Sequence, residues 1–138
     1  MTMRLLSFAL LLLAISAQAA EAMVLSCFPV RLEGAKQIDA YVDGFAPGGY
    51  PPKLIESVRV LARVGEDVFE FFPEHTKAAD VRDGVLRIHL LQPLSAGETA
   101  EIRFEGKLAA KKGEQFTMKM FIRGERRTAE NNVRCTIE

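Results

Sequence analysis

The 138-residue chain carries 18 basic and 18 acidic side chains, so its formal charge at neutral pH is zero. A neutral balance gives no general electrostatic attraction to nucleic acid, and no nucleic-acid partner is expected. The length suits one domain with a single hydrophobic core.

The first 20 residues are typical of a secretory signal peptide. A positive charge at Arg4 precedes an apolar run over residues 5–15, and small residues follow at positions 17–20. The apolar run is too short to cross a bilayer as a helix, and no second run of suitable length follows, so no transmembrane segment is expected after cleavage. The pattern predicts a periplasmic or secreted protein whose single domain spans residues 21–138.

Two cysteines, Cys27 and Cys135, lie near the two ends of this predicted domain. In an oxidising compartment we expect them to form a disulfide that ties the first strand to the last. The chain-entropy estimate for closing a loop of about 108 residues is about 4 to 5 kcal/mol. The alternative is a lipoprotein acylated at Cys27, although Glu21 and small residues separate the apolar run from the cleavage box, and Cys135 would be left as an odd thiol.

The predicted domain reads as short extended segments separated by Gly, Pro and Asp, and no stretch keeps a helical period for three turns. Apolar and polar side chains alternate most cleanly in residues 57–64 and 99–108. The turn at residues 65–67 predicts a hairpin, whereas residues 74–82 are polar enough for a loop with at most one helical turn. The expected strands cover residues 25–32, 37–42, 57–64, 68–72, 85–91, 99–108, 116–122 and 133–137.

Seven or eight strands with regularly spaced turns favour an all-β fold, with a two-sheet sandwich as the first choice and a small closed barrel as the second. Residues 86–104 contain a strand, the corner Pro93-Leu94-Ser95-Ala96-Gly97 and a second alternating strand. This segment resembles the strand, Pro-Leu-x-x-Gly corner and strand of bacterial immunoglobulin-like domains. The resemblance implies an immunoglobulin-like β-sandwich and supplies no site residue, because that superfold hosts many unrelated functions.

Residues 44–52 form the most unusual predicted loop, which joins two aromatic residues to a run of turn-forming positions and a Pro-Pro pair. Stiff aromatic loops suit recognition, because rigid aromatic side chains lose little entropy on docking. One interpretation is a candidate binding loop formed by Phe45, Tyr50, Pro51 and Pro52. The other is that Phe45 and Tyr50 fold back and cap the open end of the sandwich.

Basic residues outnumber acidic ones in residues 103–127, by eight to three. Alternation along residues 116–123 places Lys119, Phe121 and Arg123 on the outer face of one strand, and this outer-face stripe is the candidate surface for an anionic partner. Ordinary solvated strand faces are the alternative, because the basic pairs at residues 111–112 and 126–127 flank that strand at opposite ends.

Four side chains offer the thioether or imidazole groups that can bind Cu(I), namely His75, His89, Met118 and Met120. Period two places both methionines on the apolar face of their strand, which a sheet buries, whereas His89 alternates with the apolar residues of its own strand. We therefore expect Met118 and Met120 to be core residues, and we predict neither a metal site nor a cofactor.

The sequence offers no arrangement of residues that indicates catalysis. Beyond the signal peptide the serines are Ser26, Ser57 and Ser95, none of which lies in a Gly-x-Ser-x-Gly turn, and the sequence indicates no catalytic arrangement of a Ser, Cys or Thr nucleophile with a histidine. We expect a protein that is not an enzyme, an interaction module of the bacterial cell envelope whose partner is another envelope or extracellular protein. The alternatives are an inhibitor of a secreted hydrolase and a periplasmic copper-binding protein.

Overall fold

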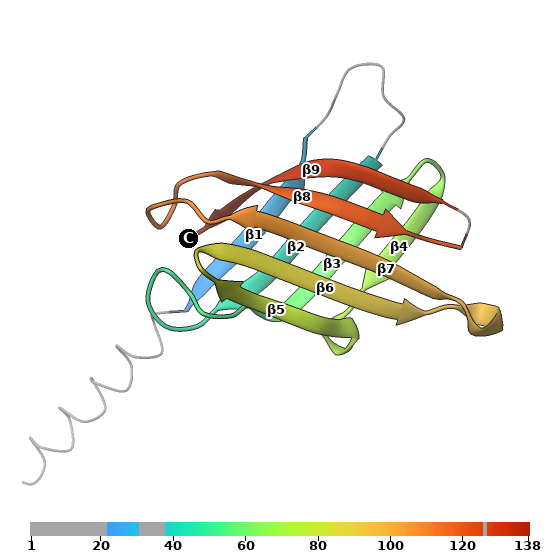
Figure 1. Ribbon diagram of the computed structural model, residues 1–138, viewed down its shortest axis with the longest axis horizontal. Helices are drawn as coiled ribbons and strands as arrows, with labels where there is room; N and C mark the ends of the chain where they lie inside the picture. Colours follow the sequence, from blue (N-terminus) through green and yellow to red (C-terminus); the bar gives the residue numbers. More distant parts are fainter. Residues whose placement is uncertain (1–21, 31–37, 126) are drawn as a thin grey trace, which may run out of the picture.

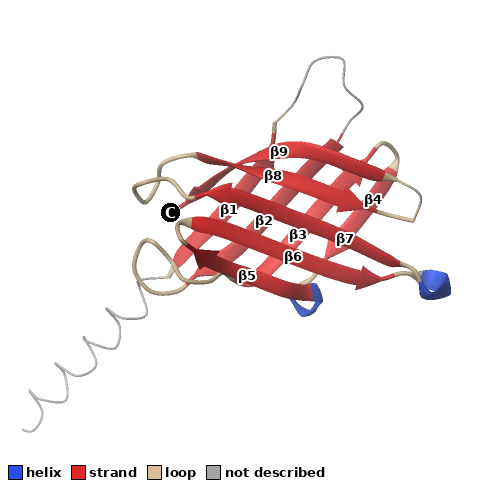
Figure 2. Ribbon diagram, viewed as in Figure 1, coloured by secondary structure: helices blue, strands red, loops and turns tan. Residues whose placement is uncertain are grey.

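The computed structural model describes residues 22–30, 38–125 and 127–138, so the predicted signal peptide lies outside the described residues. None of these described residues belongs to a helix with the length and apolar character needed to cross a membrane. Two single-turn 3-10 helices, η1 (Pro73–His75) and η2 (Ser95–Gly97), lie between strands (Figure 2). The strands are β1 (Met23–Pro29), β2 (Ile38–Ala46), β3 (Glu56–Val64), β4 (Asp67–Phe71), β5 (Thr76–Arg82), β6 (Val85–Pro93), β7 (Thr99–Lys107), β8 (Phe116–Arg123) and β9 (Thr128–Ile137).

The nine strands form one antiparallel sheet in the order β4-β3-β2-β1-β9-β8-β7-β6-β5. Strands that follow one another in sequence pair as neighbours, except β4 and β5, and the pairing of β1 with β9 joins the two halves. In Figure 1, β5–β9 cross in front of β1–β4, so the sheet curls over on itself into two layers. The predicted all-β class is confirmed, with nine strands where seven or eight were expected. The resemblance to immunoglobulin-like domains stays a prediction.

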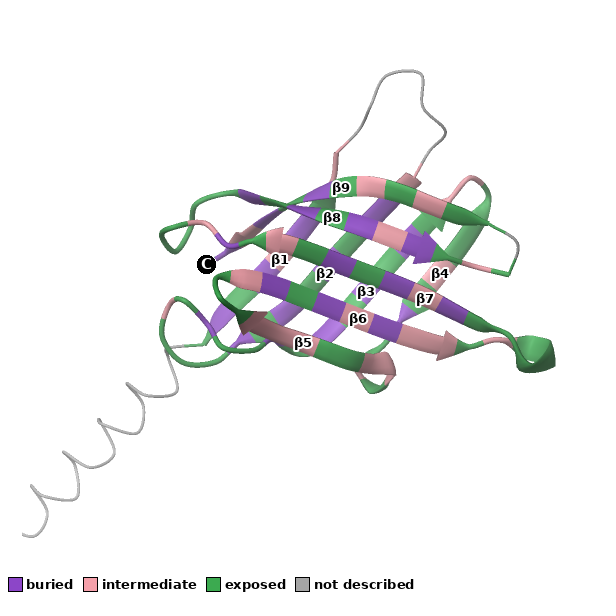
Figure 3. Ribbon diagram, in the orientation of Figure 1, coloured by how far each residue is buried: buried purple, intermediate pink, exposed green. Residues whose placement is uncertain are grey.

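The hydrophobic core lies between these two layers and follows from the alternation along each strand. In Figure 3, buried and exposed bands alternate along β6, β7 and β8. Each large apolar side chain that is fully buried contributes about 1.5–3 kcal/mol to stability. The largest of them come from both layers: Leu25, Phe71, Leu86, Ile88, Leu90, Ile102, Phe104, Met118, Met120, Ile122 and Ile137.

The segment expected to be a loop at residues 74–82 is instead mostly strand, which corrects the prediction. Only Pro73–His75 form a helical turn, and Thr76–Arg82 then pair with β6. The Asp83-Gly84 turn, with φ of 52° and 77°, joins β5 to β6 as a tight hairpin. Because β5 is an edge strand in which no residue is fully buried, pairing with β6 determines its structure more than its own weak pattern does.

Strand β2 is longer than expected, so Phe45 lies in a strand and not in the predicted loop. The strand continues to Ala46, and Gly44 lets it approach the start of β3 closely, since an added Cβ would lie 2.6 Å from Ile55 Cγ2. A turn-forming residue therefore serves here as a close contact between neighbouring strands.

The predicted disulfide is confirmed and joins β1 to β9. Cys27 and Cys135 are directly opposite in the strand pairing, with Cα atoms 4.1 Å apart, and both side chains are buried. Two backbone hydrogen bonds between Val24 and Glu138, one in each direction, extend the pairing to the end of the chain. Cys27 is thus engaged in a disulfide.

The two edge strands of the sheet differ in how they are covered. Ile55 N donates to Ala79 O, and Val81 N donates to Lys53 O, each at 2.9 Å, so the outer edge of β5 bonds to the segment before β3. Strand β4 pairs with β3 on one side, and within the described part of the chain no strand pairs with its other side.

Candidate functional site

The outer faces of the two layers differ in chemistry. Eight large hydrophobic side chains are exposed among the described residues, and seven of them lie on β1–β4 or directly after β4. The eighth, Leu54, precedes β3. An exposed apolar concentration of this kind is more informative than scattered single residues. The seven are Val24, Phe28, Tyr41, Phe45, Leu61, Val68 and Phe72.

A row of apolar side chains crosses three strands at the centre of this face. The rings of Phe28 on β1 and Tyr41 on β2 meet edge to face, with centroids 6.3 Å apart. Tyr41 lies directly opposite Leu61 of β3 in the strand pairing. Val24 and Phe45 are directly opposite in the β1–β2 pairing and lie four residues further along the same strands, beyond Ser26 and Asp43. We call these five residues the apolar outer face.

A polar row crosses the apolar outer face, and a shallow pocket borders it. Asp43 and Arg59 are opposite each other in the β2–β3 pairing, which places unlike charges side by side between the Phe28–Tyr41–Leu61 row and the other two residues of the face. A pocket of about 470 Å³ lies toward β9, lined by Phe28 and Tyr41 together with Arg134 and Thr136. Apolar anchors accompanied by polar groups are the usual composition of a protein-binding surface.

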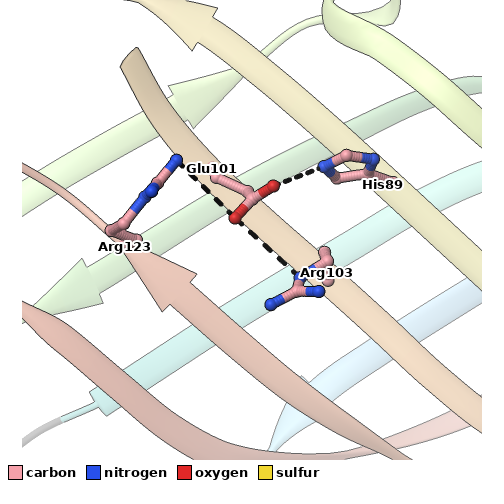
Figure 4. A network of polar contacts seen from close by, with 4 residues as sticks. All are labelled: His89, Glu101, Arg103 and Arg123. Carbon is pink, nitrogen blue, oxygen red and sulfur yellow. Dashed lines mark hydrogen bonds and ion pairs between the residues drawn. The ribbon is translucent and has the colours of Figure 1, made fainter. Parts of the chain in front are cut away.

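The opposite outer face, on β6–β8, carries a network of charged side chains centred on Glu101 (Figure 4). His89 Nε2 donates a hydrogen bond of 2.7 Å to Glu101. Arg123 and Arg103 lie 3.8 Å and 3.9 Å from the other carboxylate oxygen. The Glu101 side chain is only 17% exposed, whereas both arginines are more than half exposed. This face is therefore polar, with its charges largely paired.

The predicted outer-face stripe falls within this charged surface. Lys119 and Arg123 are exposed on β8, as expected, and Phe121 is half-buried between them. The Arg103 guanidinium lies 4.7 Å from the centre of the Phe121 ring, and Arg123 faces Glu101. An anion at the stripe would compete with these contacts, and the stripe's anion-binding role stays a prediction.

The structure does not bring the four residues of the candidate binding loop together. Tyr50 is half-buried against the core, and its hydroxyl donates to the carbonyl of Ala109. Burial, and secondarily the charge of Glu114, raise the pKa of the Tyr50 phenol. Pro52 is buried, Pro51 is exposed, and Phe45 lies on the outer face of β2. Tyr50 thus packs inward, while Phe45 belongs to a different surface.

The candidate copper ligands are also separated. Met118 and Met120 are fully buried on the inner face of β8, which confirms the core interpretation. His89 lies on the outer face, and His75 Nδ1 accepts a hydrogen bond from the Phe72 backbone N–H. In the part of the chain that the structure describes, no group of three or more His, Cys, Asp or Glu side chains gathers as metal ligands would.

Sequence reasoning missed the apolar outer face, although a signal for it exists. Residues 23–28 are apolar in both phases of the alternation, with Met23 and Leu25 inward and Val24 and Phe28 outward. Tyr41 likewise stands between the inward residues Ala40 and Val42. A strand with apolar residues on both faces indicates that its second face is used.

Comparison with protein-family models, curated proteins and solved structures finds no match to this chain. Its class is therefore defined by its own geometry. It is an all-β protein built on one curled, nine-stranded antiparallel sheet whose first and last strands share a disulfide.

Proposed function

We propose that the protein is a non-catalytic interaction module of the bacterial cell envelope, exported to the periplasm or beyond. It binds another envelope or extracellular protein through the apolar outer face of β1–β3. The observation that carries the proposal is that, among the described residues, seven of the eight exposed large hydrophobic side chains lie on β1–β4 or directly after β4.

The shape and composition of the surface favour a protein over a small ligand. Phe28 and Tyr41 are 59% and 41% exposed, and side chains on three neighbouring strands form one broad surface. Aromatic anchors with charged groups around them often supply most of the energy of a protein interface. The partner is therefore expected to present apolar side chains of its own, surrounded by polar groups.

The predicted export agrees with the presence of a disulfide. A buried disulfide between β1 and β9 suits an oxidising compartment, where such bonds form and persist. This supports the export that the first 20 residues predict. The expected partner is accordingly another protein of that compartment or of the cell exterior.

Crosslinking in cells of the native host, followed by mass spectrometry of what copurifies with a tagged copy, tests the proposal. We expect the wild-type protein to recover a reproducible envelope partner and the double variant Phe28→Ser, Tyr41→Ser to lose it. Leu54→Ser is the matched control, because Leu54 is 41% exposed but lies off this face. Recovery of the monomer alone, or equal recovery of the partner by all three proteins, would contradict the proposal.

The identity of the captured protein also separates the alternatives. Capture of a secreted hydrolase would favour the inhibitor alternative, and a rate assay on that hydrolase with the purified protein would then be decisive. A captured protein without hydrolytic activity would favour the interaction module.

A further inference from the structure

We propose that strand β4 accepts an extended segment of the partner protein as an additional strand, and that this segment alternates basic and apolar side chains. The inference rests on the proposed function, because it names how a second part of the same partner is held. It uses a different surface from the apolar outer face.

Among the strands that the structure describes, none pairs with the edge of β4 that lies away from β3, and we call this its free edge. Figure 1 shows β4 as the last strand of the layer formed by β1–β4. Val64 and Asp67 are paired across the two-residue turn Gly65-Glu66, and such a closing pair is hydrogen-bonded. By alternation, Phe69 and Phe71 bond to β3, so the N–H and C=O groups of Val68 and Glu70 face away from it. Exposed groups of this kind are a template for an incoming strand.

A pocket of about 600 Å³ runs beside this free edge. Residues 66–70 line it together with Gln92, Leu94 and Gly124. Phe69 packs on Gly124, where an added Cβ would lie 2.7 Å from the Phe69 ring, so the wall of the pocket is partly apolar. The opposite face of β4 presents Val68, which is 54% exposed, beside the exposed Glu70. An added strand therefore meets one apolar side chain of β4 on each face, Phe69 on one and Val68 on the other.

The charge of the pocket selects the segment that fits. Its ionisable lining residues are Glu66, Asp67, Glu70 and Glu125, with Arg127 as the one opposing base among those that line it. An acidic edge attracts basic side chains and repels acidic ones. A second copy of this chain is disfavoured for the same reason, since pairing β4 with itself would bring Asp67 and Glu70 against their own kind.

Synthetic peptides test the inference on the purified, disulfide-bonded protein. The probe is an acetylated, amidated peptide of alternating lysine and valine, and the comparison peptide has glutamate in place of every lysine. We expect the lysine peptide to shift the NMR signals of the Val68 and Glu70 amides and the glutamate peptide to leave them unchanged. No shift with the lysine peptide, or equal shifts with both peptides, would overturn the proposal.

Two variants separate backbone pairing from simple charge attraction. Val68→Pro removes an edge N–H that does not bond to β3, a place where strands tolerate proline, and we expect it to weaken peptide binding about tenfold. Val68→Ala keeps the N–H and is expected to bind within about threefold of wild type. Equal affinity of Val68→Pro and Val68→Ala would overturn strand addition. Glu70→Lys, an exposed change, leaves three acidic and two basic residues in the lining, so it is expected to reduce the preference for the lysine peptide, and an unchanged preference would contradict the role of charge.

Two further measurements keep this inference separate from the proposed function. The double variant Phe28→Ser, Tyr41→Ser is expected to bind the lysine peptide as the wild type does, so failure at β4 and failure at the apolar outer face are read independently. Loss of peptide binding in that folded variant would overturn β4 as a distinct site. Sedimentation measures the oligomeric state of the purified protein. A monomer supports a basic partner. A dimer that Val68→Pro abolishes would assign the edge to a second copy and overturn the proposal.

Discussion

Cys27 and Cys135 are directly opposite each other where β1 pairs with β9, and their disulfide closes a loop with a sequence separation of 108. The link therefore spans the point at which the two layers join. We expect replacement of both cysteines by alanine to lower the free energy of unfolding by about 4 to 5 kcal/mol. Urea unfolding measures this, with reduced wild-type protein as the control. Equal stability of the double variant and the oxidised wild type would contradict the expectation.

The buried methionines of β8 give a second prediction. Met118 is fully buried, so Met118→Ala is expected to cost about 2–5 kcal/mol, whereas Met118→Leu, which keeps most of the volume, should cost less than about 1.5 kcal/mol. Denaturant unfolding distinguishes them. A Cu(I) titration that binds metal in the wild type and fails in the Met118→Leu, Met120→Leu variant would revive the copper-binding alternative.

Gly106 of β7 lies against the backbone of the neighbouring strand. An added Cβ would contact the Thr117 carbonyl oxygen and lie 2.9 Å from Met118 Cα, atoms that cannot move without shifting β8. We expect Gly106→Ala to destabilise the protein by about 1–3 kcal/mol. Gly49→Ala is the matched control, because nothing lies within 4 Å of its added Cβ, and its effect should stay within about 0.5 kcal/mol. Equal unfolding midpoints for the two variants would be inconsistent with this close contact.

The carboxylate at the centre of the charged outer face should matter more than its exposed neighbour. Glu101 is 17% exposed and contacts His89 and two arginines, so Glu101→Gln is expected to cost about 1 kcal/mol. Glu105 is 63% exposed and lies 3.4 Å from Arg87, so Glu105→Gln should cost less than about 0.5 kcal/mol. Thermal unfolding at low and high salt checks both. A larger loss of stability in Glu105→Gln than in Glu101→Gln would show that the exposure of a carboxylate does not determine how much it stabilises this network.

The inner faces could be predicted from the sequence because each central strand alternates between one apolar and one polar face. Residues 58, 60 and 62 on β3 and Met118 and Met120 on β8 are buried as that alternation predicts. The alternation does not identify the buried face of a strand when both faces are apolar or when neither is. Phe28 on β1 obscures the pattern by being apolar and exposed, and β5 obscures it by being polar and half-buried at an edge.

The candidate surfaces depend on which strands are neighbours, and a single sequence does not contain that information. Alternation alone places Lys119, Phe121 and Arg123 on one face of β8. The contact of Arg123 with Glu101 follows from the β7–β8 register, in which the two residues are directly opposite. In the same way the Phe28–Tyr41 contact depends on the β1–β2 register, and the free edge of β4 depends on the order of the whole sheet.

The Tyr50 phenol makes the stability depend on pH in the alkaline range. Its pKa is raised above the ordinary value of about 10, first by burial and then by the charge of Glu114. The neutral phenol is thus favoured in the folded state. Its contribution to stability is complete below the ordinary pKa and is lost as the pH rises through the higher folded-state pKa.

Tyr50→Phe is expected to remove this alkaline dependence and, at neutral pH, to cost about 0.5–1.5 kcal/mol through loss of the hydrogen bond to Ala109. Urea unfolding at a series of alkaline pH values measures both effects. Tyr41→Phe is the control and should leave the dependence attributed to Tyr50 in place, because Tyr41 lies on the apolar outer face, away from Ala109. If the wild type and Tyr50→Phe lost stability in parallel as the pH rose, the titrating group would be another residue, and the inward packing of Tyr50 would contribute only at neutral pH.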